Sequence, residues 1–393
     1  MEVITKEERD IIIHILNMNS TYERIIAFKN NIDKLKGCRI FLFDEKESNV
    51  GKTFGNYEFG KCGIYSIGDY TKTWIIDSEH ISDLNQLCIG KAIDFDLNIL
   101  TYLNRILQKR SVNVDKRDFI EYINYIKTNG FRIDIYSAMM ERVKTPINLN
   151  IFAEMITSFV RLDNMTQLDE NNNDFYLSQD DWKRVKSVFD IALQYEKCPN
   201  PQYDALCCCI MKAFLIKNFD KSLKAQEKVE HLIRYCLDEL KCYIEKEIVL
   251  LSLYLLDDNA TTETFKKLNK RKNIIKNIYN VAWDIYHIRL IEQVMLYDNM
   301  RDKNQIILSY FGTADKGLID AININPLKAV VIFKEQIIPI HKMNIQDVCQ
   351  NEELLKDAHS NVSIRANEIK LINFFEKRKE LEQEILKKTG QSS

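Results

Sequence analysis

The sequence predicts an α/β fold in which a parallel sheet is flanked by helices, with a large all-helical insertion and a small strand-rich element near the N-terminus. Short apolar runs typical of strands alternate with segments of helical spacing over 91–143 and again over 274–333, and this alternation favours a parallel sheet. Between them, 180–256 has helical periodicity. Only 11 glycines and 5 prolines occur in 393 residues, so we expect few turns and long helices.

Residues 1–87 form the first predicted element. Apolar residues recur at helical spacing over 1–36. Between Cys38 and Ile76 the pattern changes to short strand-like runs separated by glycines. We therefore predict a helical lead-in followed by a small strand-rich element.

The main predicted domain covers 88–335. Its first half alternates strands and helices: a strand at 91–96, a turn at 97–98 and a helix at 99–107 are followed by a helix at 117–128, a strand at 131–136 and a helix at 137–143. The alternation resumes at 274–297, 305–311, 315–322 and 328–333. A helical insertion at about 165–265 separates the halves, and 336–393 is expected to be a C-terminal helical tail because 368–386 is amphipathic and charged.

The charge balance excludes a global attraction to polyanions. The chain has 55 Lys and Arg against 57 Asp and Glu, a net charge of -2, so contact with a nucleic acid must be local. Ten cysteines and six histidines show no zinc-like spacing. The longest apolar runs are shorter than the roughly 18 residues needed to cross a bilayer. We expect a soluble cytoplasmic protein with reduced thiols and no membrane partner.

Four acidic residues interrupt otherwise apolar stretches. Asp96 follows directly on a strand and begins a helix, and open α/β sheets bind ligands beyond the carboxyl ends of their strands. Asp315 repeats this placement, while Glu141 and Asp284 lie on predicted helices. Asp is also a preferred helix cap. Because a carboxylate without a partner is costly to bury, we expect these acids either to pair with cations or to converge on a metal ion.

The first two acids carry a resemblance to the PIN-like nuclease family. Members open with a strand that ends in Asp-x-Asn, which here is Asp96-Leu97-Asn98. They continue with a glutamate on a helix, a position that Glu141 matches. Asp94 lies two residues before Asp96 on the same strand face, so either of them can lead the site.

The later motifs of the family follow in order. Asp284 matches an aspartate near the start of a helix, and Thr313-Ala314-Asp315 matches a strand that ends in Thr-x-Asp. Asp204 also resembles the third acid, but no strand ending in Thr-x-Asp follows it closely. The resemblance covers about 88–163 and 270–335 and depends on the order of four short motifs.

The resemblance implies a PIN-like nuclease domain that binds Mg²⁺ or Mn²⁺ through catalytic acids, which are Asp96, Glu141, Asp284 and Asp315. These cations prefer oxygen ligands, lower the pKa of a bound water and neutralise charge at a phosphodiester. Asn98 and Thr313 would position the acids or a substrate phosphate, with ordinary cap and turn roles as the alternative. The implied activity is that of a metal-dependent endoribonuclease acting on RNA rather than DNA, which fits a toxin or an antiviral-defence effector.

A basic run just before Asp284 is a candidate contact for the nucleic-acid backbone. It consists of Lys266, Lys267, Lys270, Arg271, Lys272 and Lys276. The alternative is a solvated helix face, because such runs are common.

Two rival functions remain open. Arg9-Asp-Ile-Ile-Ile-His14 has the Arg-x₄-His spacing of HEPN ribonucleases, which cleave without metal, although its three isoleucines favour a core helix. The second rival is a catalytically silent interaction protein that binds a partner, or a second copy of itself, through the helical insertion or the C-terminal helix.

Overall fold

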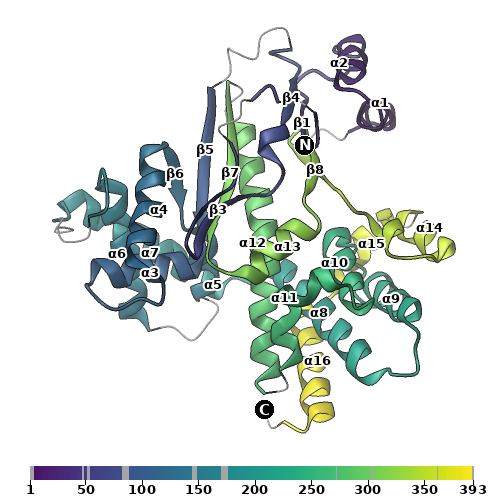
Figure 1. The fold of residues 1–393 in the computed structure, drawn as a ribbon. Helices are drawn as coiled ribbons and strands as arrows, with labels where there is room; N and C mark the ends of the chain where they lie inside the picture. The colour runs from purple at the N-terminus through teal and green to yellow at the C-terminus, as the bar shows by residue number, and fades with distance from the viewer. Residues whose placement is uncertain are drawn as a thin grey trace. The chain divides into compact units, whose positions relative to one another are not determined.

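The computed structural model describes residues 4–46, 48–50, 54–81, 88–143, 148–169, 176–270, 272–301, 304–360 and 362–391. The chain divides into two compact units (Figure 1). The first unit consists of 1–196, 290–314 and 326–340, and the second unit consists of 197–289, 315–325 and 341–393. The chain therefore passes between the units several times.

A five-stranded sheet forms the centre of the first unit. Its strands, in spatial order, are β2 (Tyr57–Phe59), β3 (Cys62–Ser66), β7 (Gln305–Thr313), β5 (Cys88–Phe95) and β6 (Phe131–Asp134). β7, β5 and β6 are parallel, whereas β2 and β3 are antiparallel additions. The prediction of a parallel sheet is therefore correct for three strands only. β2 and β3 form a hairpin through the two-residue turn at Gly60, whose φ is +60°, and a hairpin joins antiparallel strands.

Five helices of the first unit follow β5 and β6 in the chain. They are α3 (Leu97–Leu107), α4 (Lys116–Thr128), α5 (Tyr136–Val143), α6 (Leu149–Asn164) and α7 (Gln179–Lys197). Figure 1 shows α3, α4, α6 and α7 gathered at the β6 side of the sheet. The end of the long helix α12 (Ile274–Arg301) also belongs to this unit, and its Asn299 side chain bonds both backbone groups of Ile307 in β7.

A second, antiparallel sheet completes the first unit. Its strand order is β4 (Trp74–Asp77), β1 (Arg39–Leu42), β8 (Leu327–Phe333) and β9 (Gln336–His341). Apolar residues of β1 and β8 share a core with α1 (Lys6–Leu16) and α2 (Thr21–Asn30). The short 3-10 turn η1 (Tyr70–Lys72) precedes β4.

The strand pairings cross the predicted domain boundaries at 87/88 and 335/336. β1 and β3 come from the predicted N-terminal element, yet they pair with β8 and β7. β9 is a strand inside the predicted helical tail. Strand pairing joins segments more than 200 residues apart, and a local sequence pattern does not contain the identity of a strand's partner.

The described part of the second unit is helical. It contains α8 (Pro201–Phe219), α9 (Ala225–Arg234), the π turn η3 (Tyr235–Glu239), α10 (Glu245–Leu255), η4 (Asn259–Thr261), α11 (Thr262–Phe265), η5 (Lys266–Asn269), the start of α12, α13 (Lys316–Ile324), η6 (Ile345–Asp347), α14 (Glu352–Ser360), α15 (Val362–Glu368), η7 (Ile369–Leu371) and α16 (Phe374–Thr389). Most of the predicted helical insertion and most of the predicted C-terminal tail thus form one unit, while α7 belongs to the first unit.

The C-terminal helix α16 is already occupied by a neighbour within its own unit. Phe374, Leu381 and Ile385 of α16 are buried, and α16 packs along α8. Arg378 of α16 forms an ion pair with Asp204 of α8. The apolar stripe that predicted a partner-binding helix is therefore covered by α8, and the carboxylate of Asp204 has a structural role.

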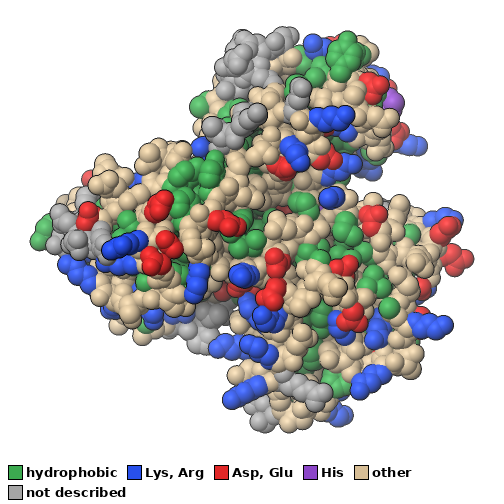
Figure 2. Space-filling view, in the orientation of Figure 1, with side chains coloured by type: hydrophobic (Ala, Val, Ile, Leu, Met, Phe, Trp, Pro, Cys, Tyr) green, Lys and Arg blue, Asp and Glu red, His purple; other side chains and the backbone are tan. Residues whose placement is uncertain are grey.

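No helix in the described ranges is long and apolar enough to cross a membrane. On the face drawn in Figure 2, acidic and basic side chains are interspersed.

Candidate active site at the ends of β5 and β6

Asp96 is fixed at the junction of β5 and α3. It caps α3, because its Oδ1 accepts a hydrogen bond from the Ile99 backbone N–H at 2.7 Å. Thr313, the last residue of the parallel neighbour β7, donates its hydroxyl hydrogen to Asp96 Oδ2 at 2.5 Å. The side chains of Asp96 and Thr313 are both buried. The acid thus acts as a helix cap and is also held in one orientation from β7.

Asp94 lies two residues before Asp96, on β5, and is buried. Its neighbour in the parallel register is Asp134 of β6. Ser137, in the first turn of α5, donates its hydroxyl hydrogen to Asp94 Oδ2, whereas Oδ1 has no hydrogen-bond partner within the described residues. Burial raises the pKa of the Asp94 carboxyl, and the negative charges of Asp134 and Asp96 raise it further.

These acids lie at the point where the chain reverses its direction of strand addition. β5 is the central strand of the parallel group, β6 is added on one side of it, and β7 is added on the other. Such a switch point leaves a crevice outside the carboxyl end of the central strand, and open α/β sheets bind their ligands there. Asp96 directly follows β5, and Thr313 is the last residue of β7. Both residues therefore lie at that position.

The other predicted residues of the first unit lie on the helices α5 and α3. Glu141 is half-buried in the middle of α5, the helix that follows β6. Asn98 is the second residue of α3, and its side chain is exposed.

The second unit brings together Asp284 and Asp315 around a lysine. Lys267 Nζ lies 2.8 Å from an Asp284 oxygen and 3.3 Å from an Asp315 oxygen. Asp315 also caps α13 through the Gly317 N–H, at 2.8 Å. Burial alone would lower the pKa of the Lys267 ammonium, but the two carboxylates raise it above its usual value. This cluster therefore already contains its own cation.

The predicted basic surface is only partly available for a nucleic acid. Lys267 is committed to Asp284 and Asp315, and Lys266 pairs with Glu263 at 3.2 Å. Lys270, Lys272 and Lys276 are exposed, and Arg271 lies outside the described residues. The run crosses η5, a turn and the start of α12, so it does not form one helix face.

The four predicted metal ligands are divided between the units. Asp96 and Glu141 belong to the first, and Asp284 and Asp315 belong to the second. In the part of the chain that the structure describes, no group of three or more His, Cys, Asp or Glu side chains could hold a metal ion as they stand. A metal site that uses all four acids stays a prediction.

Sequence reasoning missed two residues of this site, Asp134 and Ser137. Asp134 ends β6 in the same way that the predicted acid Asp96 follows β5. An acid at the end of each of two neighbouring parallel strands was a readable signal. Ser137 carried no local signal, because its role depends on α5 returning to the end of β5.

The rival ribonuclease motif is placed at the surface. Arg9 and His14 are exposed on α1. Two of the isoleucines near them, Ile12 and Ile15, are buried, whereas Ile13 is 48% exposed. The apolar run between Arg9 and His14 is thus only in part a core-facing stripe.

In comparisons with protein-family models, curated proteins and solved structures, nothing matches this chain.

Proposed function

We propose that this chain is a metal-dependent, PIN-like nuclease that hydrolyses phosphodiester bonds, with RNA as the preferred substrate and Asp94 and Asp96 at the centre of its site. The observation that carries the proposal is the position of these two buried acids at the switch point of the parallel strands β7, β5 and β6. The parallel strands, and the order of the acids along the chain, are the features shared with the PIN-like pattern.

The residues fit a hard divalent cation. Mg²⁺ is usually bound through only one or two carboxylates, with waters and substrate phosphates as its other ligands, so Asp94 and Asp96 are sufficient protein ligands. Asp94 Oδ1 is buried and has no hydrogen-bond partner among the described residues. A raised carboxyl pKa beside other carboxylates marks a place where a cation would relieve repulsion.

Each residue has a distinct task in this proposal. A bound cation supplies positive charge that activates a water molecule and offsets the negative charge of the phosphodiester. Thr313 and the Ile99 N–H hold the Asp96 carboxylate in one orientation. Asp134 is half-buried and accepts the Tyr136 N–H at 2.9 Å, and we assign it to accept the proton of the attacking water. Glu141, Asp284 and Asp315 remain proposed contributors.

The test is cleavage of end-labelled single-stranded RNA, structured RNA and single-stranded DNA with Mg²⁺, Mn²⁺ or EDTA. Asp94→Asn and Asp96→Asn should each lower the rate at least about 100-fold, because several kcal/mol of charge stabilisation depend on the cation. Asp180→Asn is the matched control, because Asp180 is exposed in the first unit. Circular dichroism would confirm that each variant folds.

Three outcomes would contradict the proposal. Cleavage that persists in EDTA and is lost in His14→Ala would move the activity to α1. Rates in the two site variants equal to that of Asp180→Asn would exclude these acids. Absence of both cleavage and cation binding in the folded protein would favour a catalytically silent interaction protein.

A further inference from the structure

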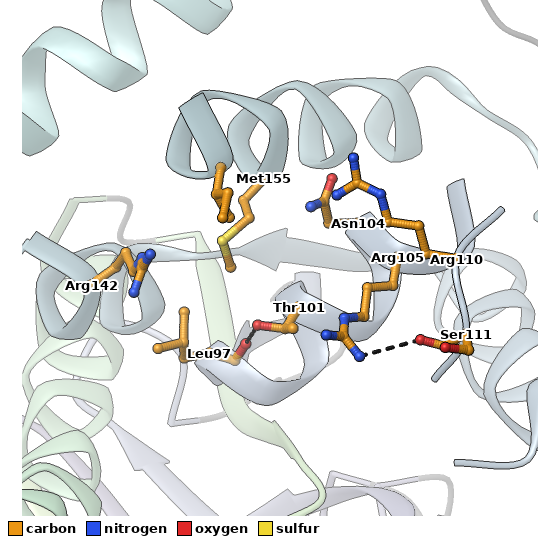
Figure 3. Close-up of a pocket in the computed structure, with 9 residues that line it drawn as sticks. Leu97, Thr101, Asn104, Arg105, Arg110, Ser111, Arg142 and Met155 are labelled. Carbon is orange, nitrogen blue, oxygen red and sulfur yellow. Dashed lines mark hydrogen bonds between the residues drawn. The ribbon is translucent and has the colours of Figure 1, made fainter. Parts of the chain in front are cut away.

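A pocket of about 450 Å³ opens between α3, α5 and α6 of the first unit. Three arginines contribute to its wall, and they come from different segments: Arg105 from α3, Arg110 from the loop after α3, and Arg142 from α5. Figure 3 shows Arg142 on one side of the cavity and Arg105 and Arg110 on the other, with Met155 of α6 between them. Neither the sequence motifs nor the acid site explains this concentration of positive charge.

The contacts of Arg105 and Arg110 leave positive charge on the wall of the pocket. Among the described residues, Arg105 donates a hydrogen bond to the Ser111 carbonyl, at 3.2 Å (Figure 3), and a guanidinium carries five N–H donors. Arg110 lies 3.2 Å from Glu154, with the two side chains 53% and 34% exposed. An exposed pair of this kind is weak, so a ligand with more negative charge can compete for Arg110. Guanidinium groups match phosphate oxygens two at a time.

The rest of the wall suits the uncharged part of a nucleotide. Leu97, Ile151 and Met155 supply apolar surface, and Thr101 and Asn104 supply polar groups. A volume of about 450 Å³ lies within the range of pockets that enclose small organic ligands. A base must be unpaired to enter such a cavity, which favours a single strand over a duplex.

Helix α3 connects this pocket with the acids. Asp96 caps the start of α3, and Leu97, the next residue in the chain, lines the pocket. Leu97, Thr101 and Arg105 recur every four residues and therefore lie along one face of the helix. At 1.5 Å per residue, Arg105 is about 14 Å along the axis from Asp96. A strand with its cleaved phosphate at the acids would place flanking nucleotides over this face.

The geometry points to a nucleotide-binding subsite in this pocket, in which Arg105, Arg110 and Arg142 bind phosphates of a single-stranded nucleic acid beside the cleavage position. This inference rests on the proposed nuclease function for the identity of the ligand. It replaces the basic run before Asp284 as the main backbone contact, because Lys267 of that run is held by Asp284 and Asp315 and the run does not form one helix face.

The experiment measures binding of a fluorescein-labelled twelve-residue oligouridylate to the full chain by anisotropy, in EDTA and at several salt concentrations. The pocket variant is Arg105→Ala with Arg142→Ala. The control variant is Arg117→Ala with Lys186→Ala, which removes the same charge from exposed sites on α4 and α7. We expect the pocket variant to bind about 10-fold more weakly and its salt slope to fall by roughly 1.4, since each lost phosphate contact removes about 0.7.

Arg105→Lys with Arg142→Lys separates a binding role from a merely structural one. Lysine keeps the charge but loses the two-pronged contact, so the salt slope should recover while the affinity stays reduced. A pocket variant that matches the control variant in affinity and slope would overturn the inference. Competition by uridine monophosphate at the same concentration as the oligomer would also overturn it, because the pocket would then select a mononucleotide.

The same measurements keep the two proposals apart. Metal-dependent cleavage with oligomer binding that is unaffected in the pocket variant would remove this subsite alone. Oligomer binding that is lost in the pocket variant, in a protein that neither cleaves nor binds metal, would remove the nuclease function and leave the subsite.

Discussion

The acids of the first unit and those of the second unit reach electrostatic balance in different ways. In the second unit, Lys267 lies within 3.3 Å of both Asp284 and Asp315. In the first unit, Asp94 faces other carboxylates, one of its oxygens has no hydrogen-bond partner among the described residues, and the pKa of its carboxyl is raised by burial and by its neighbours. Acidic residues thus form an ion-pair cluster with a lysine in the second unit. In the first unit they lie beside one another, and their repulsion raises the pKa of Asp94.

This contrast bears on where a cation would bind first under the proposed function. A divalent ion at Asp284 and Asp315 would have to displace a lysine whose pKa these acids already raise. An ion at Asp94 would compete with a proton instead, because burial and the neighbouring carboxylates raise the pKa of that carboxyl. We therefore expect the first metal to bind in the first unit.

The largest effect on stability is expected at Asp77, a buried acid that is paired with an arginine. Asp77 forms a buried ion pair with Arg39 at 2.6 Å. Asp77→Asn should lower the free energy of unfolding by about 3 kcal/mol, because it leaves a buried guanidinium without its counter-charge. Urea unfolding at pH 7 would measure the loss. If the variant were as stable as wild type, the Asp77–Arg39 ion pair would not stabilise the fold, and this part of the comparison would be wrong.

The pH dependence of this effect has a definite sign. Burial alone would raise the pKa of Asp77, but Arg39, with further help from His80 and the Glu79 N–H, holds it below the usual value. The contribution is therefore present above the unfolded pKa, near 4, and is lost as the pH falls through the lowered folded value. The difference between Asp77→Asn and wild type should shrink steadily below pH 4.

Lys267 offers a smaller test of the closed cluster. Lys267→Met and Asp284→Asn, measured singly and together, form a double-mutant cycle. We expect a coupling free energy on the order of 1 kcal/mol, since the Lys267 side chain is 34% exposed and solvent weakens such pairs. A coupling near zero would mean that the lysine does not stabilise these acids, and the contrast between the units would be lost.

The smallest expected effect has the opposite direction. Because the pKa of Asp94 is raised in the folded protein, the folded state keeps a proton that the unfolded chain has lost. Stability therefore falls as the pH rises from about 4 through that raised value. Asp94→Asn should therefore make the metal-free protein slightly more stable, and asparagine can still accept the Ser137 hydroxyl hydrogen.

Thermal unfolding in EDTA at pH 5 and pH 8 would measure this gain, which should be larger at pH 8. A variant that is less stable than wild type at pH 8 would show that the charged carboxylate is already satisfied without metal.

The sequence predicted the parts of the site that depend on neighbouring residues. The strand that leads to Asp96 and the helix that follows it were predicted from local apolar patterns, and so was the strand that ends at Thr313. Lys267 was expected to face a nucleic acid, but it pairs with Asp284 and Asp315. That pairing depends on how η5 packs near α12 and α13, which no local pattern specifies.

The fold shows the same limit. Three parallel strands were recoverable because each is followed or preceded by a helix of clear period. The antiparallel pairing of β3 with β7 was not, because these segments are separated by most of the chain. The division into two units, which the chain crosses repeatedly, was hidden for the same reason.

Calorimetric titration of the metal-free protein with Mn²⁺, in two buffers that differ in ionisation enthalpy, tests the central claim most directly. We predict binding that strengthens from pH 5 to pH 8 and releases a proton, because Asp94 must be deprotonated to become a ligand. Asp94→Asn with Asp96→Asn should abolish this binding, while Asp180→Asn should leave it unchanged. Absence of Mn²⁺ binding, or binding that survives in the double variant, would contradict a cation site at the ends of β5 and β6.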